Sequence, residues 1–291
     1  MRISVLVENT SHRPELGCEH GLSLYVETNK HRLLFDTGAS NLFLLNAEQM
    51  GVDLTKIDTL IISHGHYDHG GGLQSFLQVN TKALVYLQEE AFETHCALRA
   101  DGRIEDIGID ATLKHHPRVI LNPGSMKIDD QLSLFTVNDC LLSDSCSQTA
   151  RSIDAGTRDP NLFQMSDGEL KPDSFAHEQN LIIHEKNSLI ALTGCAHNGV
   201  AIILDSLKQI TGRLPDHFIG GFHLSRNPQD AEHNHRVDRL ANYLRGTDTR
   251  FYTCHCTGIE AFKRLHAIMG EQVVYLSTGD VLLIGENPAI I

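Results

Sequence analysis

The chain lacks a long apolar run, a basic secretion segment and an internal repeat. No stretch approaches the roughly 18 consecutive apolar residues that a membrane-spanning helix needs. The first residues already alternate like a strand, without the basic segment and apolar segment that open a secretion signal. We therefore expect a soluble, cytoplasmic protein with no membrane partner.

Basic side chains are also scarce, since 24 Lys and Arg stand against 37 Asp and Glu, which gives a formal net charge of −13. This charge repels polyanions, and no Lys/Arg cluster offsets it. We therefore expect no nucleic-acid partner. A small anionic molecule stays compatible with the sequence, because bound divalent cations would make a site less negative than the whole chain.

The seven cysteines form an odd, dispersed set in a chain of 291 residues. A protein of this size buries enough apolar surface to fold without covalent cross-links. We therefore expect free thiols or metal ligands rather than disulfides. The composition, 41% hydrophobic and 21% charged, is that of an ordinary globular protein.

The most informative segment is residues 60–72, which read LIISHGHYDHGGG. An apolar run that favours a buried strand ends just before His64, and His66 follows two residues later on the same face. Asp68 and His69 come next, and three glycines then allow the backbone to turn tightly. Imidazole and carboxylate ligands together suit Zn, Mn or Fe, and two such ions could share a hydroxide.

A chance cluster is the alternative interpretation of this segment, because the chain contains 18 histidines. The strand that precedes the motif and the glycines that follow it favour a metal site instead. The same placement recurs further along the chain, where other histidine-bearing loops also come directly after strand-like segments. Loops at strand ends are where α/β enzymes carry their chemistry.

Hydrophobic periodicity predicts a layered α/β protein. We expect strands at residues 3–7, 57–62, 83–87, 217–219, 250–253, 273–276 and 281–284, hairpins at 22–35 and 181–192, and helices at 41–50, 201–210, 230–244 and 259–269. Between about residues 89 and 174 the pattern loosens into polar, Gly/Asp-rich pieces. We interpret residues 1–291 as a single domain with this insertion lying over the active-site face, as a lid or oligomer region.

The pattern His64-x-His66-x-Asp68-His69 after an apolar strand resembles the signature of the metallo-β-lactamase superfamily. Residues 33–38, LLFDTG, are similar to the first element of that superfamily, in which the aspartate, here Asp36, usually orients a metal ligand. A turn-initiating Asp is the alternative for this position. The resemblance implies a four-layer αββα sandwich and two divalent metal ions, zinc in the first place with Mn or Fe as alternatives.

The resemblance also implies ligands from later loops. Cys195, in Thr-Gly-Cys, occupies the place of the superfamily's bridging Asp, and it is either a thiolate ligand or a small buried residue at a strand end. His255 resembles the last metal-binding histidine. The implied arrangement has one ion on His64, His66 and His197, the other on Asp68, His69 and His255, and Cys195 between them.

The sequence departs from the superfamily pattern at the third imidazole of the first ion. That imidazole usually precedes the second hairpin in a Gly-His-Thr-Pro-Gly-like turn, where this chain has only His177 and Glu178. Either of these fills the position or His197 substitutes for it, and we favour His197 because glycines flank its loop at a strand end. His223, after two glycines, could contact substrate or donate a proton.

The segments at 178–179, 193–199, 220–224 and 255–258 are similar to one subfamily. It includes archaeal 7,8-dihydropterin-6-yl-methyl-4-(β-D-ribofuranosyl)aminobenzene 5′-phosphate synthases and many metal-dependent hydrolases. The resemblance implies a hydrolase in which a metal-bound hydroxide attacks a small anionic ester or phosphate-containing substrate, with Asp68 and His223 as catalytic residues. The alternatives are a pterin-type synthase that releases pyrophosphate, a di-iron redox protein and a non-catalytic metal-binding protein. A homo-oligomer is compatible with each of them.

Overall fold

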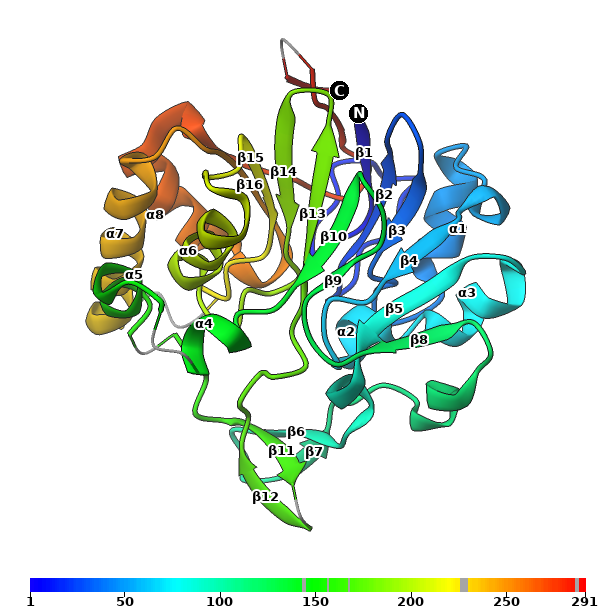
Figure 1. The fold of residues 1–291 in the computed structure, drawn as a ribbon, viewed down its shortest axis with the longest axis horizontal. Helices are drawn as coiled ribbons and strands as arrows, with labels where there is room; N and C mark the ends of the chain where they lie inside the picture. The colour runs from blue at the N-terminus through cyan, green and yellow to red at the C-terminus, as the bar shows by residue number, and fades with distance from the viewer. Residues whose placement is uncertain (143–144, 156, 167, 226–229, 286–287) are drawn as a thin grey trace. The chain divides into compact units, whose positions relative to one another are not determined.

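The computed structural model describes residues 1–142, 145–155, 157–166, 168–225, 230–285 and 288–291 (Figure 1). The chain divides into two compact units. Unit 1 comprises Met1–Pro123, Asp159–Gln179 and Ser277–Ile291, and unit 2 comprises Gly124–Arg158 and Asn180–Leu276. The single-domain organisation expected for the chain stays a prediction.

Unit 1 contains an eight-stranded sheet with the order β19-β18-β1-β2-β3-β4-β5-β8. The strands from β18 to β3 pair antiparallel, whereas β3, β4, β5 and β8 run parallel, so their carboxyl ends meet at one edge. The bounds are β1 (Arg2–Val7), β2 (Ser23–Glu27), β3 (Arg32–Phe35), β4 (Thr59–Ile61), β5 (Leu84–Gln88), β8 (Val119–Asn122), β18 (Val281–Leu283) and β19 (Ala289–Ile290).

Helices α1 (Leu42–Gln49) and α3 (Leu73–Val79) pack on this sheet (Figure 1). In α3, Leu73, Phe76 and Leu77 lie on one face at helical spacing and are buried against apolar strand residues. This burial anchors the segment that follows β4, which continues through the short helix α2 (Tyr67–Gly70). The 3-10 turns η1 (Leu54–Lys56), η2 (Glu89–Phe92) and η3 (Ala111–His115) complete the connections.

A separate four-stranded antiparallel sheet, which we call the small sheet, also belongs to unit 1 and has the order β12-β11-β6-β7. Its strands are β6 (His95–Leu98), β7 (Ile104–Asp106), β11 (Leu162–Ser166) and β12 (Glu169–Pro172). Two segments that are far apart in sequence therefore form one sheet.

Unit 2 contains a seven-stranded sheet with the order β17-β16-β15-β14-β13-β10-β9. The bounds are β9 (Met126–Lys127), β10 (Leu132–Phe135), β13 (Asn180–Glu185), β14 (Ser188–Leu192), β15 (His217–Gly220), β16 (Arg250–Thr253) and β17 (Val273–Tyr275). Strands β14 to β17 are parallel, so the loops after them emerge at one edge. The helices are α4 (Asn138–Leu142), α5 (Gln148–Ile153), α6 (Val200–Thr211), α7 (Ala231–Arg245) and α8 (Ile259–Met269), with the turns η4 (His255–Thr257) and η5 (Gly270–Gln272).

The mixed α/β fold expected from the sequence is confirmed, because each unit combines a sheet with helices and the predicted strands and helices are present with slightly shifted ends. The segment at 89–174 contributes β8 to one principal sheet, β9 and β10 to the other, and all strands of the small sheet. Residues 143–144, 156 and 167 of this segment lie outside the described residues.

The expectation that disulfides are absent is wrong for one pair, because Cys140 and Cys146 are bonded with their Cα atoms 5.2 Å apart. The backbone amides of Ser145 and Cys146 both donate to the Cys140 carbonyl, and this turn brings the two cysteines together. The other five cysteines are free thiols, as expected.

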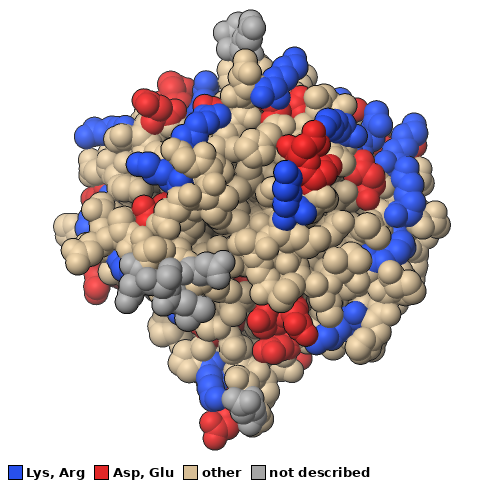
Figure 2. All heavy atoms as spheres, in the orientation of Figure 1, with Lys and Arg blue, Asp and Glu red and all other residues tan. Residues whose placement is uncertain are grey.

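In the described parts of the chain, no helix is both long and apolar enough to cross a bilayer. Figure 2 shows acidic and basic side chains interspersed over one face of the molecule.

Candidate metal centre

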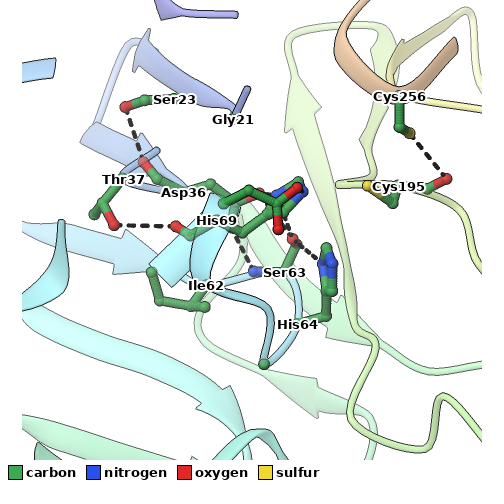
Figure 3. A network of polar contacts seen from close by, with 12 residues as sticks. Gly21, Ser23, Asp36, Thr37, Ile62, Ser63, His64, His69, Cys195 and Cys256 are labelled. Atoms are coloured by element: carbon green, nitrogen blue, oxygen red, sulfur yellow. Dashed lines mark hydrogen bonds and ion pairs between the residues drawn. The ribbon is translucent and has the colours of Figure 1, made fainter. Parts of the chain in front are cut away.

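The carboxylate of Asp36 lies at the centre of a buried network in unit 1 (Figure 3). Asp36 follows β3, has φ of 59°, and donates its amide to the carbonyl of Ile61 at 2.8 Å on the adjacent parallel strand. The backbone amide and the hydroxyl of Ser63 both donate to the carboxylate at 2.7 Å. Nδ1 of His69 lies 2.6 Å from the same carboxylate. The orienting role expected for Asp36 therefore has a geometric basis.

This network determines which ring nitrogens carry protons. A carboxylate only accepts, so His69 donates from Nδ1 to Asp36. The Ser63 hydroxyl gives its proton to Asp36 and therefore accepts from Nδ1 of His64 at 2.8 Å. These tautomers, inferred from the hydrogen bonds, leave the Nε2 lone pairs of both histidines available for a metal ion.

The rings of the three motif histidines lie close together. The ring centroids of His64 and His66 are 4.6 Å apart, and those of His64 and His69 are 4.1 Å apart. Asp68 lies on α2, where its carboxylate is 3.7 Å from Nε2 of His69 and 3.2 Å from Nε2 of His20. The four ligands predicted from the motif thus form one buried cluster in unit 1.

Close backbone packing explains the glycines of the motif. A Cβ atom at Gly65 would lie 2.3 Å from the carbonyl oxygen of Ala91, and one at Gly71 would lie 2.4 Å from that of Ala39. Real side chains do not tolerate such distances, so any larger residue would displace the histidine loop.

A second cluster in unit 1 surrounds Asp173, and sequence reasoning missed Asp173 and His95 as its members. His95, at the start of β6, and His177 lie 3.1 Å and 3.2 Å from Oδ2 of Asp173, while Nε2 of His66 lies 3.9 Å away. Nδ1 of His177 accepts a hydrogen bond from the Gly65 amide at 2.9 Å. Both nitrogens of His177, one of the alternatives for the third imidazole, are therefore engaged.

The Asp173 cluster has strongly shifted pKa values. Burial alone would raise the pKa of Asp173, but hydrogen bonds from His177 and His95 and the nearby His66 ring outweigh it and hold the pKa well below its usual range. Burial lowers the pKa of His66, and burial together with the adjacent His95 lowers the pKa of His177 to about 3.

In unit 2 the remaining predicted residues lie in the loops after three parallel strands. Cys195 and His197 follow β14, His223 follows β15, and His255 follows β16. His223 and His255 both have φ of 50°, a left-handed conformation that is rare outside glycine and marks a sharp turn out of the strand. Gly220 has φ of 141°, and a Cβ atom there would lie 2.0 Å from the Thr193 carbonyl oxygen.

These loops contact one another within unit 2. The rings of His197 and His223 are 4.3 Å apart, and ligand atoms of Cys195, His223 and Cys256 lie within 4.8 Å of one another. The His223 amide donates to Sγ of Cys256 at 3.3 Å, and that thiol lies 3.6 Å from the Cys195 carbonyl (Figure 3).

Cys256 was not among the expected ligands. Burial would raise the pKa of its thiol, but hydrogen bonds with Cys195 and His223 and the nearby His255 hold the pKa well below its usual value. The sequence offered only the weak Cys-x-Cys spacing with Cys254 as a signal.

A cavity of about 290 Å³ opens next to the His255 loop in unit 2. Leu224 and Ser225 line it together with Thr257, Gly258 and the first residues of α8, and His233, Asn234 and Arg264 close it. Backbone amides at the start of a helix favour negative charge.

Comparisons with known proteins show what the chain is similar to. Residues 16–127 match the family model described as the metallo-beta-lactamase superfamily. The chain is similar to a solved structure, Tm1679, a metal-dependent hydrolase of the beta-lactamase superfamily, with a TM-score of 0.79 and 26% identity over 98% of this chain and 100% of that one.

Two proteins of Methanocaldococcus jannaschii are also similar. The uncharacterized protein MJ0448 is 26% identical over 288 residues, covering 96% of this chain and 99% of that protein. A 7,8-dihydropterin-6-methyl-4-(beta-D-ribofuranosyl)-aminobenzene-5'-phosphate synthase is 25% identical over 272 residues, covering 86% of this chain and 88% of the synthase.

Proposed function

We propose that the chain, whose residues 16–127 match the family model of the metallo-beta-lactamase superfamily, is a member of that superfamily and a metal-dependent hydrolase acting on a small anionic ester or phosphate-containing substrate. The observation that carries the proposal is the Asp36–Ser63 network. It holds Nδ1 of His64 and of His69, so that each ring would bind a metal ion through Nε2. Similarity to a protein described as a metal-dependent hydrolase supports the same reaction class.

The donor set fits divalent ions. Imidazoles, a carboxylate and a thiol are ligands that zinc accepts, and the imidazoles and carboxylate also suit Mn or Fe. We propose two ions, with ligands drawn from His64, His66, Asp68, His69, Cys195, His197 and His255. When bound, the ions supply a Lewis acid that polarises a phosphoryl or carbonyl oxygen.

The chain's own residues would contribute orientation and proton transfer. Nδ1 of His223 is buried and has no hydrogen-bond partner among the described residues. An imidazole in that state can hold or release a proton for a reacting group, so we assign His223 the role of proton donor. We assign Asp68 to the reacting centre because it adjoins Nε2 of His69 at 3.7 Å.

The cavity at the start of α8 supports an anionic substrate. The helix begins at Ile259, directly after Gly258, so its first amides are available to an anionic group. Two hydroxyl side chains, Ser225 and Thr257, line the same cavity. A phosphate or carboxylate placed there would be held by hydrogen bonds and by the helix dipole rather than by the chain's net charge.

Metal analysis of the purified protein, combined with hydrolysis of phosphodiesters, phosphomonoesters, lactones and thioesters, tests this function. We expect His66→Ala and His69→Ala to lower bound metal and to abolish turnover. His31→Ala is the matched control, because His31 pairs with Asp58 at 3.0 Å outside the Asp36–Ser63 network, and this variant should retain both bound metal and turnover. Retained metal and full activity in both motif variants would refute the assignment.

Similarity to the pterin synthase over most of the chain favours one second candidate, a transferase that releases pyrophosphate. The two functions are separable with a dihydropterin pyrophosphate as substrate. A synthase releases pyrophosphate only when the aminobenzene partner is present, whereas a hydrolase releases it alone. Iron with oxygen-dependent turnover, or bound metal without any turnover, would instead support the redox or the non-catalytic alternative.

A further inference from the structure

The buried carboxylate of Asp173 is held from both sides by fixed groups. The residue follows β12 and is 4% exposed. Oδ1 accepts the amide of Phe175 at 2.7 Å, and Oδ2 faces His95 at 3.1 Å and His177 at 3.2 Å. Each of these partners is itself buried. The carboxylate therefore has a defined position in unit 1.

Hydrogen-bond chemistry fixes the proton positions of the two close imidazoles. The Gly65 amide can only donate, so Nδ1 of His177 accepts and Nε2 carries the proton that is donated to Asp173. In His95, Nδ1 faces the carboxylate and Nε2 faces the Glu90 carbonyl at 3.2 Å. Both partners are acceptors, so either nitrogen of His95 can only donate to the group that it faces.

This proton arrangement argues against a metal ion among these residues. Ligand atoms of His66, His95, Asp173 and His177 lie within 4.8 Å of one another, which is close enough for a shared ion. However, a metal on His177 would need a lone pair on Nε2 while Nδ1 still accepts from Gly65. A neutral imidazole has only one lone-pair nitrogen, and in His177 that nitrogen is Nδ1. The position between His177 and Asp173 is therefore occupied by the Nε2 proton and not by a metal ion.

We propose that Asp173 is a positioning residue for His66, which it presents to the metal through Nδ1. Oδ2 of Asp173 lies 3.9 Å from Nε2 of His66, longer than a hydrogen bond but close enough for a buried carboxylate to favour the proton on that nitrogen. The lone pair then resides on Nδ1. The inference rests on the proposed function only in taking His66 as a ligand.

The three motif imidazoles thereby act in two different orientations. His64 and His69 have Nδ1 tied to Ser63 and Asp36 and present Nε2, whereas His66 has Nε2 facing Asp173 and presents Nδ1. Carboxylates that orient a ligating histidine typically change metal affinity 10- to 100-fold when they are removed, on the order of the effect expected here.

Long-range ¹⁵N–¹H NMR of the metal-free wild-type protein is the first test, since it reports which histidine nitrogens are protonated without any variant. We expect His66 and His177 in the Nε2–H form. His66 in the Nδ1–H form would overturn the proposal. A wild-type protein that bound no divalent ion would refute the proposed function together with this role of Asp173, whereas the Nδ1–H form of His66 in a protein that does bind zinc would refute the role of Asp173 alone.

Zinc affinity, measured by competition with a chelator, is the second test. We expect Asp173→Asn to bind zinc roughly 10- to 100-fold more weakly than wild type and to lose the His66 Nε2–H preference. Asp106→Asn is the matched control, because Asp106 is an exposed carboxylate on β7 of the same sheet that accepts the Gly108 amide at 2.8 Å, and the zinc affinity of this variant should stay within about twofold of wild type.

A purely structural role predicts a different pattern. In that case Asp173→Asn would lower the unfolding temperature while zinc affinity and the His66 tautomer of the folded protein stayed as in wild type, and the proposal would be wrong. If Asp173→Asn does not fold, the wild-type NMR measurement decides alone.

Discussion

Replacing Asp36 by Asn tests how far one buried carboxylate controls the metal loop. Asn suits this position because φ is 59°, a conformation that Asn and Asp adopt more readily than other side chains. The shape of the side chain is preserved, and the amide oxygen can still accept from the Ser63 backbone. The NH₂ group, however, then faces the Ser63 hydroxyl and Nδ1 of His69.

The expected magnitude follows from these contacts. Two donors cannot share a hydrogen bond, so the His69 proton moves to Nε2, the nitrogen that would bind the ion. Metal binding must then reverse this tautomer, and loss of such an orienting carboxylate weakens affinity about 10- to 100-fold, or about 1.4 to 2.7 kcal/mol. The metal-free protein also loses a hydrogen bond to a charged group, which costs about 1.5 to 3 kcal/mol of unfolding free energy.

Chelator competition and urea unfolding measure these two effects separately. Asp58→Asn is the matched control, because Asp58 also accepts from an imidazole, Nδ1 of His31 at 3.0 Å, but is 40% exposed and outside the network. We expect its metal affinity to match wild type. If Asp36→Asn binds metal as tightly as Asp58→Asn, the claim that the network presents Nε2 of His69 is incorrect.

Two further predictions concern packing and burial. Gly65→Ala places a methyl group 2.3 Å from the Ala91 carbonyl oxygen, so urea unfolding should show a loss of about 1 to 3 kcal/mol, whereas Gly124→Ala, with open space around it, should match wild type. Burial raises the pKa of Asp154 to about 7, so the folded metal-free protein retains a proton that the unfolded chain releases above its ordinary pKa of 3.8. Stability should therefore fall as pH rises between these values, by at most about 1.4 kcal/mol per unit, and Asp154→Asn should flatten that slope; an equal slope in both proteins would contradict the burial argument.

The elements that carry the motif were predictable because their signals are local. The apolar run before His64 is a strand, whereas the glycines after His69, from which a tight turn was inferred, have ordinary helical backbone angles at Gly71 and Gly72 and serve close packing instead. The loop residues Cys195, His223 and His255 likewise follow strands, as periodicity indicated. Strand ends are visible in a sequence because a 2-residue alternation stops where turn residues begin.

The Asp173 cluster was not predictable in the same way. His95 and Asp173 are 78 positions apart, and only the pairing of β6 with β11 brings them together. No spacing rule connects such residues, because the register of strands from distant segments depends on tertiary packing. The Cys140–Cys146 bond was missed although its two cysteines are only 6 positions apart. The prediction relied on the general rule that proteins of this size need no disulfides, and it did not consider this local spacing.

The small sheet is assembled from two strand pairs that the chain visits on separate occasions, and it delivers both His95 and Asp173 to the histidine loop. Substitutions in this sheet would therefore affect the proposed metal site. If His66 is a metal ligand as proposed, substitutions in β6 or β12 that move His95 or Asp173 would change metal affinity without touching the histidine loop itself. Redesign of this sheet would therefore need metal affinity to be measured alongside stability.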